Sequence, residues 1–182
     1  MNPPRRSRLQ LFALFAVFAA PFVAALLLAY AGWHPGTRSY GTPVLPQQSL
    51  RDAPVTLADG GRFAWKDTAP RWTLVVLPGP GCAQACVREL GLLHAARVRI
   101  NRKELLLRLL YVGEPPADAA ARALLASWAV GRDDAGRLAA FRATRADGVA
   151  ALLVEPDGTA LTAYPDGYDA NLLLKDLQKV VK

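Results

Sequence analysis

Runs of apolar residues divide the chain into one long N-terminal segment and a series of shorter elements behind it. Residues 9–30 are almost wholly apolar and carry no charge, and about twenty such residues in a helix, at 1.5 Å each, cross the hydrocarbon core of a bilayer. Residues 72–77 (WTLVVL) form a continuous apolar run rich in β-branched side chains, which predicts a strand buried on both faces. Apolar runs at residues 105–112 and 149–154 predict two further strands.

Segments with helical spacing alternate with these strands. Apolar side chains recur at helical intervals over residues 82–101 and 170–181, and residues 117–128 are alanine-rich. The remaining expected elements are a small hairpin over residues 55–65, a short helix over residues 138–145 and a strand over residues 160–164, which the turn Glu155-Pro156-Asp157-Gly158 precedes. A βαβ unit followed by a β-hairpin and a closing helix predicts an α/β fold, a thioredoxin-like mixed sheet flanked by helices and preceded by one N-terminal transmembrane helix.

The charges around the apolar N-terminal segment predict its orientation. Arg5, Arg6 and Arg8 precede it, and positive residues stay on the cytoplasmic side, so the rest of the chain is expected outside the cytoplasm. The triplet Ala29-Tyr30-Ala31 also fits a signal-peptide cleavage site, but the apolar stretch is longer than a signal core usually is, which favours a retained anchor. We therefore predict a single-pass protein of a bacterial inner membrane whose C-terminal domain lies in the periplasm, where cysteine pairs become oxidised.

The chain of 182 residues accommodates one ordinary domain besides this anchor. We expect a cytoplasmic basic tail at 1–8, a transmembrane anchor at 9–31, a Pro/Gly-rich linker at 32–50 and a thioredoxin-like periplasmic domain at 51–182. The hydrophobic content of 52% suffices for a packed core. Much of the net charge of +7 lies before residue 51, and no motif combines aromatic and basic side chains, so no nucleic-acid partner is expected.

The chain has two cysteines, Cys82 and Cys86, directly behind the loop Pro78-Gly79-Pro80-Gly81. At a spacing of four residues they share one face of a helix, and their Cα atoms lie about 6 Å apart, within the reach of a disulfide. Cys82 is expected at the helix N-terminus, where unpaired N–H groups and the helix dipole favour a thiolate. A thiolate is the nucleophile of disulfide exchange and also a soft ligand for Cu(I). Cys82 and Cys86 are therefore the candidate catalytic residues and the candidate metal ligands.

A purely structural disulfide is the alternative for this pair. A bridge between residues four apart closes a very small loop and removes little entropy from the unfolded chain, so stabilisation is a weak reason for it.

With these motifs the sequence resembles the Sco/SenC family of copper-handling, thioredoxin-fold proteins. The resemblance rests on the CxxxC motif after a strand, on the segment 151–158 (ALLVEPDG) and on the closing helix. The chain is also similar to small membrane proteins of proteobacterial cytochrome c oxidase gene clusters, at positions Trp72, Leu74, Val75, Cys82, Cys86, Arg97 and Arg99. The resemblance implies a membrane-anchored assembly factor for cytochrome c oxidase that handles Cu(I) or reduces copper-site thiols, with an oxidase subunit or another assembly factor as its partner.

The sequence departs from that family at the third copper ligand. Sco proteins bind copper with both cysteines and a histidine shortly before the hairpin glycine; counting back from Gly158 reaches Asp147, and no histidine follows His94. Because Cu(I) accepts two thiolates alone, a Cu(I) role and a redox role both remain open. The alternatives are a dedicated periplasmic thiol–disulfide oxidoreductase, with Cys82 as nucleophile and Cys86 as resolving thiol, or a catalytically inactive thioredoxin-like scaffold.

Overall fold

The computed structural model describes residues 5–30, 39–66, 68–100 and 105–181. The chain divides into two compact units, Met1–Arg38 and Ser39–Lys182. The first unit contains the helix α1 (Arg5–Tyr30), which includes the predicted apolar segment. The second unit contains the cysteine pair and all strands of the described chain.

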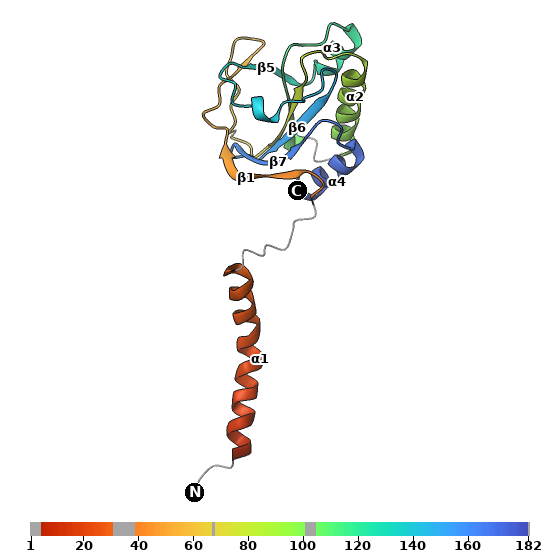
Figure 1. The fold of residues 1–182 in the computed structure, drawn as a ribbon. Coiled ribbons are helices and arrows are strands. Elements are labelled where there is room, and N and C mark those ends of the chain that lie inside the picture. The colour runs from red at the N-terminus through yellow and green to blue at the C-terminus, as the bar shows by residue number, and fades with distance from the viewer. Residues whose placement is uncertain (1–4, 31–38, 67, 101–104, 182) are drawn as a thin grey trace. The chain divides into compact units, whose positions relative to one another are not determined.

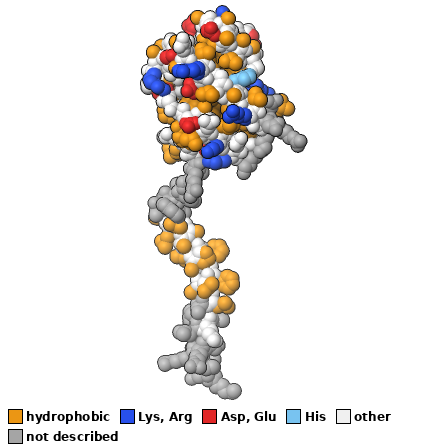
Figure 2. All heavy atoms as spheres, turned by 90° about the vertical axis from the view of Figure 1, so that its right-hand side faces the viewer, with side chains coloured by type: hydrophobic (Ala, Val, Ile, Leu, Met, Phe, Trp, Pro, Cys, Tyr) orange, Lys and Arg blue, Asp and Glu red, His pale blue; other side chains and the backbone are white. Residues whose placement is uncertain are grey.

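Helix α1 presents apolar side chains to its surroundings. Phe15 and Phe22 are 73% and 74% exposed, and Figure 2 shows hydrophobic side chains along the described part of the helix. Among the residues that the structure describes, no helix has both the length and the apolarity needed to cross a membrane. The predicted helix is therefore present. Its length and apolarity do not bear out the prediction that it is a transmembrane helix.

In the described part of the second unit, seven strands form one mixed sheet in the order β1-β7-β6-β3-β4-β5-β2 (Figure 1). The strands are β1 (Thr42–Ser49), β2 (Val55–Leu57), β3 (Trp72–Pro78), β4 (Leu107–Val112), β5 (Ala129–Asp133), β6 (Val149–Val154) and β7 (Thr159–Tyr164). The helices are α2 (Gln84–Arg99), α3 (Ala119–Leu125) and α4 (Ala170–Val180). Strands β3, β4 and β5 are parallel, and the other pairs are antiparallel. The predicted α/β thioredoxin-like sheet with flanking helices is confirmed.

Strand β3 lies between two cores, because successive side chains of a strand point to opposite faces. Leu74 and Val76 pack in a core to which α2, α3 and α4 contribute buried side chains, and Figure 1 shows α2 and α4 beside each other along the sheet. Val75 and Leu77 pack in a second core formed largely by the segments around β1, β2 and the 3₁₀ turn Ala139–Phe141. The predicted burial of this strand on both faces is correct, and it fixes the direction in which the following loop leaves the sheet.

The linker predicted at 32–50 is wrong over its second half. Residues 42–49 form β1, which pairs with β7 at the edge of the sheet. Of this strand only Val44 is buried, and its register is interrupted between Pro43 and Gln48. An edge strand tolerates prolines and polar residues, and these are the features that suggested a linker. The first part of that linker, residues 32–38, lies outside the described residues, as does Ala31 at the end of the predicted anchor.

Two local predictions also differ from the structure. The hairpin expected over residues 55–65 is present only as a short turn, with a bridge between Thr56 and Arg62 and backbone hydrogen bonds from Leu57 N–H to Gly61 O at 2.7 Å and from Phe63 N–H to Val55 O at 2.9 Å. Strand β2 also pairs with β5, a strand that the sequence did not indicate. The helix expected over residues 138–145 is only the 3₁₀ turn Ala139–Phe141. The N–H groups of Ala139, Phe141 and Arg142 donate to carbonyl oxygens three residues earlier, whereas the N–H of Ala143 donates to the carbonyl oxygen of Leu77 in β3 at 3.4 Å, so the helical bonding ends there.

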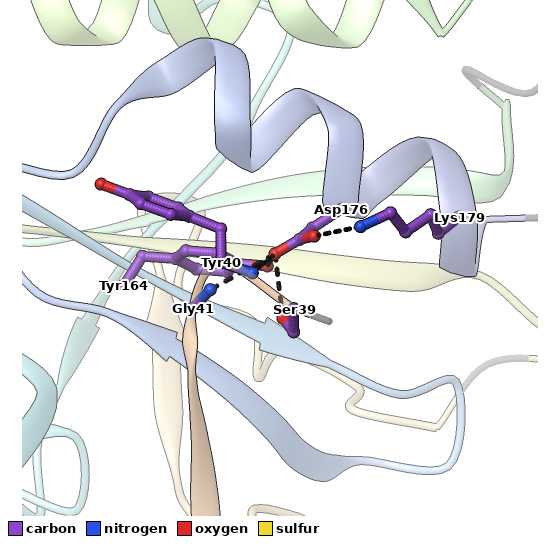
Figure 3. A network of polar contacts seen from close by, with 6 residues as sticks. All are labelled: Ser39, Tyr40, Gly41, Tyr164, Asp176 and Lys179. Carbon is purple, nitrogen blue, oxygen red and sulfur yellow. Dashed lines mark hydrogen bonds and ion pairs between the residues drawn. The ribbon is translucent and has the colours of Figure 1, made fainter. Parts of the chain in front are cut away.

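The entry of the chain into the second unit is held by Asp176 of α4 (Figure 3), a carboxylate that is only 4% exposed. It accepts hydrogen bonds from Ser39 Oγ at 2.9 Å and from the backbone N–H groups of Tyr40 at 2.5 Å and Gly41 at 3.3 Å. Tyr164 of β7 donates its hydroxyl at 3.5 Å, and Lys179 Nζ forms an ion pair at 3.1 Å. The network joins α4, β7 and the segment that leads into β1.

Candidate functional site

The two cysteines form a disulfide where β3 turns into α2, as the sequence predicts. Their Cα atoms are 5.1 Å apart. Cys82 lies in the loop before α2 and is partly exposed, whereas Cys86, in the first turn, is fully buried in the core that contains Leu90 and Leu93. The two sulfurs therefore differ in access, since an incoming thiol approaches Cys82 from solvent while the protein covers Cys86.

A second loop, residues 145–148 ahead of β6, packs directly against the cysteine loop. The N–H of Gly79 donates to the carbonyl oxygen of Gly148 at 2.9 Å, and the N–H of Gly81 donates to that of Ala146 at 2.9 Å. A Cβ atom on Gly79 would collide with the carbonyl oxygens of Arg145 and Ala146. Glycine at position 79 is what allows the two backbones to approach so closely.

Asp147, in this second loop, caps the N-terminus of α2. Its Oδ1 accepts from the N–H groups of Ala83 at 2.7 Å and Cys86 at 3.0 Å, and its Oδ2 accepts from that of Ala85 at 2.9 Å. These bonds, above all the one from Cys86, lower the pKa of the Asp147 carboxyl below its ordinary value. The expectation that unpaired N–H groups at this helix end favour a Cys82 thiolate is corrected, because the carboxylate of Asp147 occupies three of them.

The position of Asp147 could be read from the sequence, but its role as a helix cap could not. The N-cap residue of α2 is Ala83, whose side chain cannot cap the helix, whereas Ser, Thr, Asp or Asn usually occupies that position. A helix start that lacks such a residue indicates that its N–H groups find acceptors elsewhere. The missing cap could be seen in the sequence, but the sequence could not show that the acceptor is Asp147, 64 residues away from Ala83.

An open groove of about 620 Å³ borders the disulfide on the solvent side. It is lined by Cys82, Ala83, Gln84, Val87, Arg88, Ala117 and Asp118. Cys86 is absent from this lining, which agrees with its burial. The groove leaves Cys82 open to solvent beside a partly apolar surface.

The donors available to a metal ion at this site are the two sulfurs. Asp147 is engaged by three N–H groups, and the Nδ1 atom of His94 lies 3.5 Å from the indole nitrogen of Trp128. Within the described residues, no group of three or more His, Cys, Asp or Glu side chains could hold a metal ion. Two thiolates, released by reduction of the disulfide, fit linear Cu(I), but they do not provide the larger donor set that Cu(II) prefers.

Comparisons with known proteins agree on the fold. A family model described as "Transmembrane-like, thioredoxin-like, C-terminal domain" matches residues 72–182. No curated protein matches the sequence.

Three solved structures illustrate the structural likeness. The bacterioferritin comigratory protein of Xanthomonas campestris is 16% identical, with 76% of this chain and 97% of that chain covered and a TM-score of 0.54. ScoI of Arabidopsis thaliana with copper bound is 15% identical, with 78% and 97% covered and a TM-score of 0.50. AhpC of Enterococcus faecalis is 20% identical, with 65% and 80% covered and a TM-score of 0.50. At these identities the likeness extends to the thioredoxin-like fold alone.

Proposed function

The chain belongs to the family of transmembrane-like, thioredoxin-like C-terminal domains, and from this premise we propose that it carries out thiol–disulfide exchange, with Cys82 as nucleophile and Cys86 as resolving thiol. The observation that supports this proposal most strongly is that solvent has unequal access to the two cysteines of the disulfide. Cys82 borders an open groove, whereas Cys86 is fully buried beside it. Exchange needs one sulfur that a partner can reach and a second one that only the first can reach.

In the reducing direction the step proceeds through a mixed disulfide. The Cys82 thiolate attacks one sulfur of a partner disulfide; a new S–S bond forms, and the partner's other sulfur leaves with the electron pair and takes up a proton. Cys86 then loses its proton and attacks the Cys82 sulfur, which releases the second partner thiol and restores the Cys82–Cys86 disulfide. The partner gains two electrons, and an external dithiol must supply two electrons to reduce the pair again.

We propose copper-site cysteines of a cytochrome c oxidase subunit as the partner. The support is the sequence resemblance to Sco/SenC proteins, carried by the CxxxC motif and the PDG hairpin, together with the expected periplasmic compartment. Copper binds such cysteines as thiolates, so an oxidised site must be reduced before it accepts the metal. Cells that carry Cys82→Ser should accumulate oxidase subunits whose copper-site cysteines resist thiol labelling until a reductant is added.

Transport of Cu(I) by the reduced pair is the second candidate. The observation in its favour is the short distance of 5.1 Å between the Cα atoms of Cys82 and Cys86, which brings two soft sulfur ligands together. A competition titration of the reduced protein with a chromogenic Cu(I) chelator tests it. Sub-micromolar affinity that disappears in Cys86→Ser would support it, and wild-type affinity no better than that of the variant would contradict it.

For the location we propose attachment to the bacterial inner membrane through α1, with the second unit in the periplasm. The support is the exposed apolar surface of α1, and Arg5, Arg6 and Arg8 at its start. The full chain should remain with membranes after alkaline carbonate extraction, and a variant without residues 1–38 should not. Release of both proteins into the supernatant would contradict the attachment.

Trapping of the mixed disulfide tests the exchange itself. Cys86→Ser removes the resolving thiol, so the bond between Cys82 and its partner should persist and give a larger species on non-reducing gels that a reductant dissolves. Cys82→Ser is the matched control and should trap nothing. Equal amounts of trapped species in the two variants, or none in either, would contradict the proposed roles.

A further inference from the structure

The helix that carries Cys86 is capped by a carboxylate from another loop. Asp147 accepts hydrogen bonds from the N–H groups of Ala83, Ala85 and Cys86, at 2.7, 2.9 and 3.0 Å. The side chain at the helix start itself, Ala83, provides no cap. A negative charge therefore lies at the positive end of the α2 dipole, next to both cysteines.

The position of this carboxylate is fixed by its own loop. Residues 145–148 hydrogen-bond to the cysteine loop through the N–H groups of Gly79 and Gly81. At the other side, Arg145 donates its Nε to Asp166 Oδ2 at 2.8 Å and its backbone N–H to the same oxygen at 3.1 Å. Asp147 is thus held between two anchored segments, and it remains on the helix end when the disulfide is reduced as long as these segments stay in place.

A thiolate at Cys82 would use the N–H groups and the dipole field that Asp147 already uses. In thiol–disulfide proteins, stabilisation of the thiolate stabilises the reduced form and makes the pair more oxidising. A carboxylate at the same place has the opposite effect, because it withdraws the donors and repels a second negative charge.

We propose that Asp147 is a positioning residue that stabilises the Cys82–Cys86 disulfide relative to the dithiol and so makes the reduced pair a stronger reductant. The inference rests on the proposed exchange function and specifies its direction: the protein donates electrons to a partner disulfide rather than introducing disulfides. It also gives a role to the aspartate that stands where the resembling copper proteins have a histidine.

The test is a redox equilibrium of the full chain in detergent with glutathione buffers at pH 7. In this equilibrium two glutathione thiols reduce one protein disulfide, and the product is glutathione disulfide. Asp147→Asn keeps an oxygen acceptor for the helix but removes the charge. We expect it to raise the equilibrium constant for reduction about three- to tenfold, a potential about 15 to 30 mV less negative. Asp147→Glu keeps the charge and should remain closer to the wild type than Asp147→Asn.

Asp169→Asn is the matched control, because Asp169 caps α4, a helix without cysteines, through the N–H groups of Asn171 at 2.7 Å and Leu172 at 3.4 Å. It should lower the urea midpoint as Asp147→Asn does, but leave the redox equilibrium unchanged. If the wild-type pair exchanges with glutathione but Asp147→Asn has the same equilibrium constant for reduction, the inference is overturned and the proposed function stands. The same holds if Asp147→Asn and Asp169→Asn shift that constant equally. A wild-type pair that never exchanges with glutathione would overturn the proposed function, and the inference with it.

Discussion

Removal of the Asp176 carboxylate should loosen the start of the domain. In Asp176→Ala the backbone N–H groups of Tyr40 and Gly41 lose their acceptor, as do the hydroxyls of Ser39 and Tyr164. Hydrogen bonds to charged groups contribute about 1.5 to 3 kcal/mol each, and buried donors without a partner cost about 1 to 3 kcal/mol. The hydroxyls can turn to other acceptors and the side chain of Lys179 in the ion pair is largely exposed, so the two backbone bonds dominate.

From these two bonds we expect a loss of about 3 kcal/mol in the free energy of unfolding. For a urea dependence of about 1 to 3 kcal/mol per molar, the unfolding midpoint falls by about 1 to 3 M. Tryptophan fluorescence of the full chain in detergent follows the transition, since Trp65 and Trp128 are buried in the second unit. Asp52→Ala, at an exposed aspartate, is the control and should change the free energy by less than about 0.5 kcal/mol.

A loss in Asp176→Ala no greater than that in Asp52→Ala would refute the reasoning. It would mean that the Ser39–Gly41 segment is not held by Asp176 and that β1 keeps its place through pairing with β7 alone.

Three further outcomes follow from the packing and the charges. Gly79→Ala should destabilise the domain by about 1 to 3 kcal/mol in urea unfolding, because its Cβ meets the fixed carbonyl oxygens of Arg145 and Ala146; stability equal to the wild type would contradict the close approach of the two loops. Gly91→Ala, within α2 and with nothing within 4 Å of a Cβ, should stabilise it by up to about 1 kcal/mol; a loss would contradict the open space. Burial raises the pKa of Asp176, but its hydrogen bonds outweigh burial and lower that pKa below the ordinary 3.8. The contribution of Asp176 to the free energy of unfolding is therefore complete above pH 3.8 and is lost as the pH falls through the pKa of the folded state. Asp176→Asn should consequently lose less stability than the wild type between about pH 5 and pH 2. Parallel curves of unfolding free energy against pH would contradict this.

The parts of the fold that the sequence predicted are those whose pattern is local. The apolar run at 72–77 predicted a strand buried on both faces, which β3 is, and β6 is likewise buried along its whole length. The amphipathic spacing at 170–181 predicted α4, which ends within a residue of that range. In each case the residues that define the element also supply its buried contacts.

The parts that the sequence did not predict depend on distant partners. Strand β1 carries prolines and exposes most of its side chains, and its backbone pairs with β7, more than a hundred residues later. Asp147 likewise caps α2 by accepting from the N–H of Ala83, 64 residues before it. Neither a strand at a sheet edge nor a cap from another loop leaves a periodic pattern, so local patterns could locate Cys82 and Cys86 but not the carboxylate beside them.

The central claim is that Cys82 and Cys86 exchange electrons as a pair, and a redox titration of the wild-type chain tests it most directly. The protein is equilibrated with graded ratios of reduced to oxidised dithiothreitol, quenched with acid and labelled with a thiol reagent that adds mass. The account predicts one reversible two-electron transition that adds two labels together and is absent from Cys82→Ser and Cys86→Ser. A pair that keeps its disulfide at every ratio, or that gains one label without the other, would contradict it.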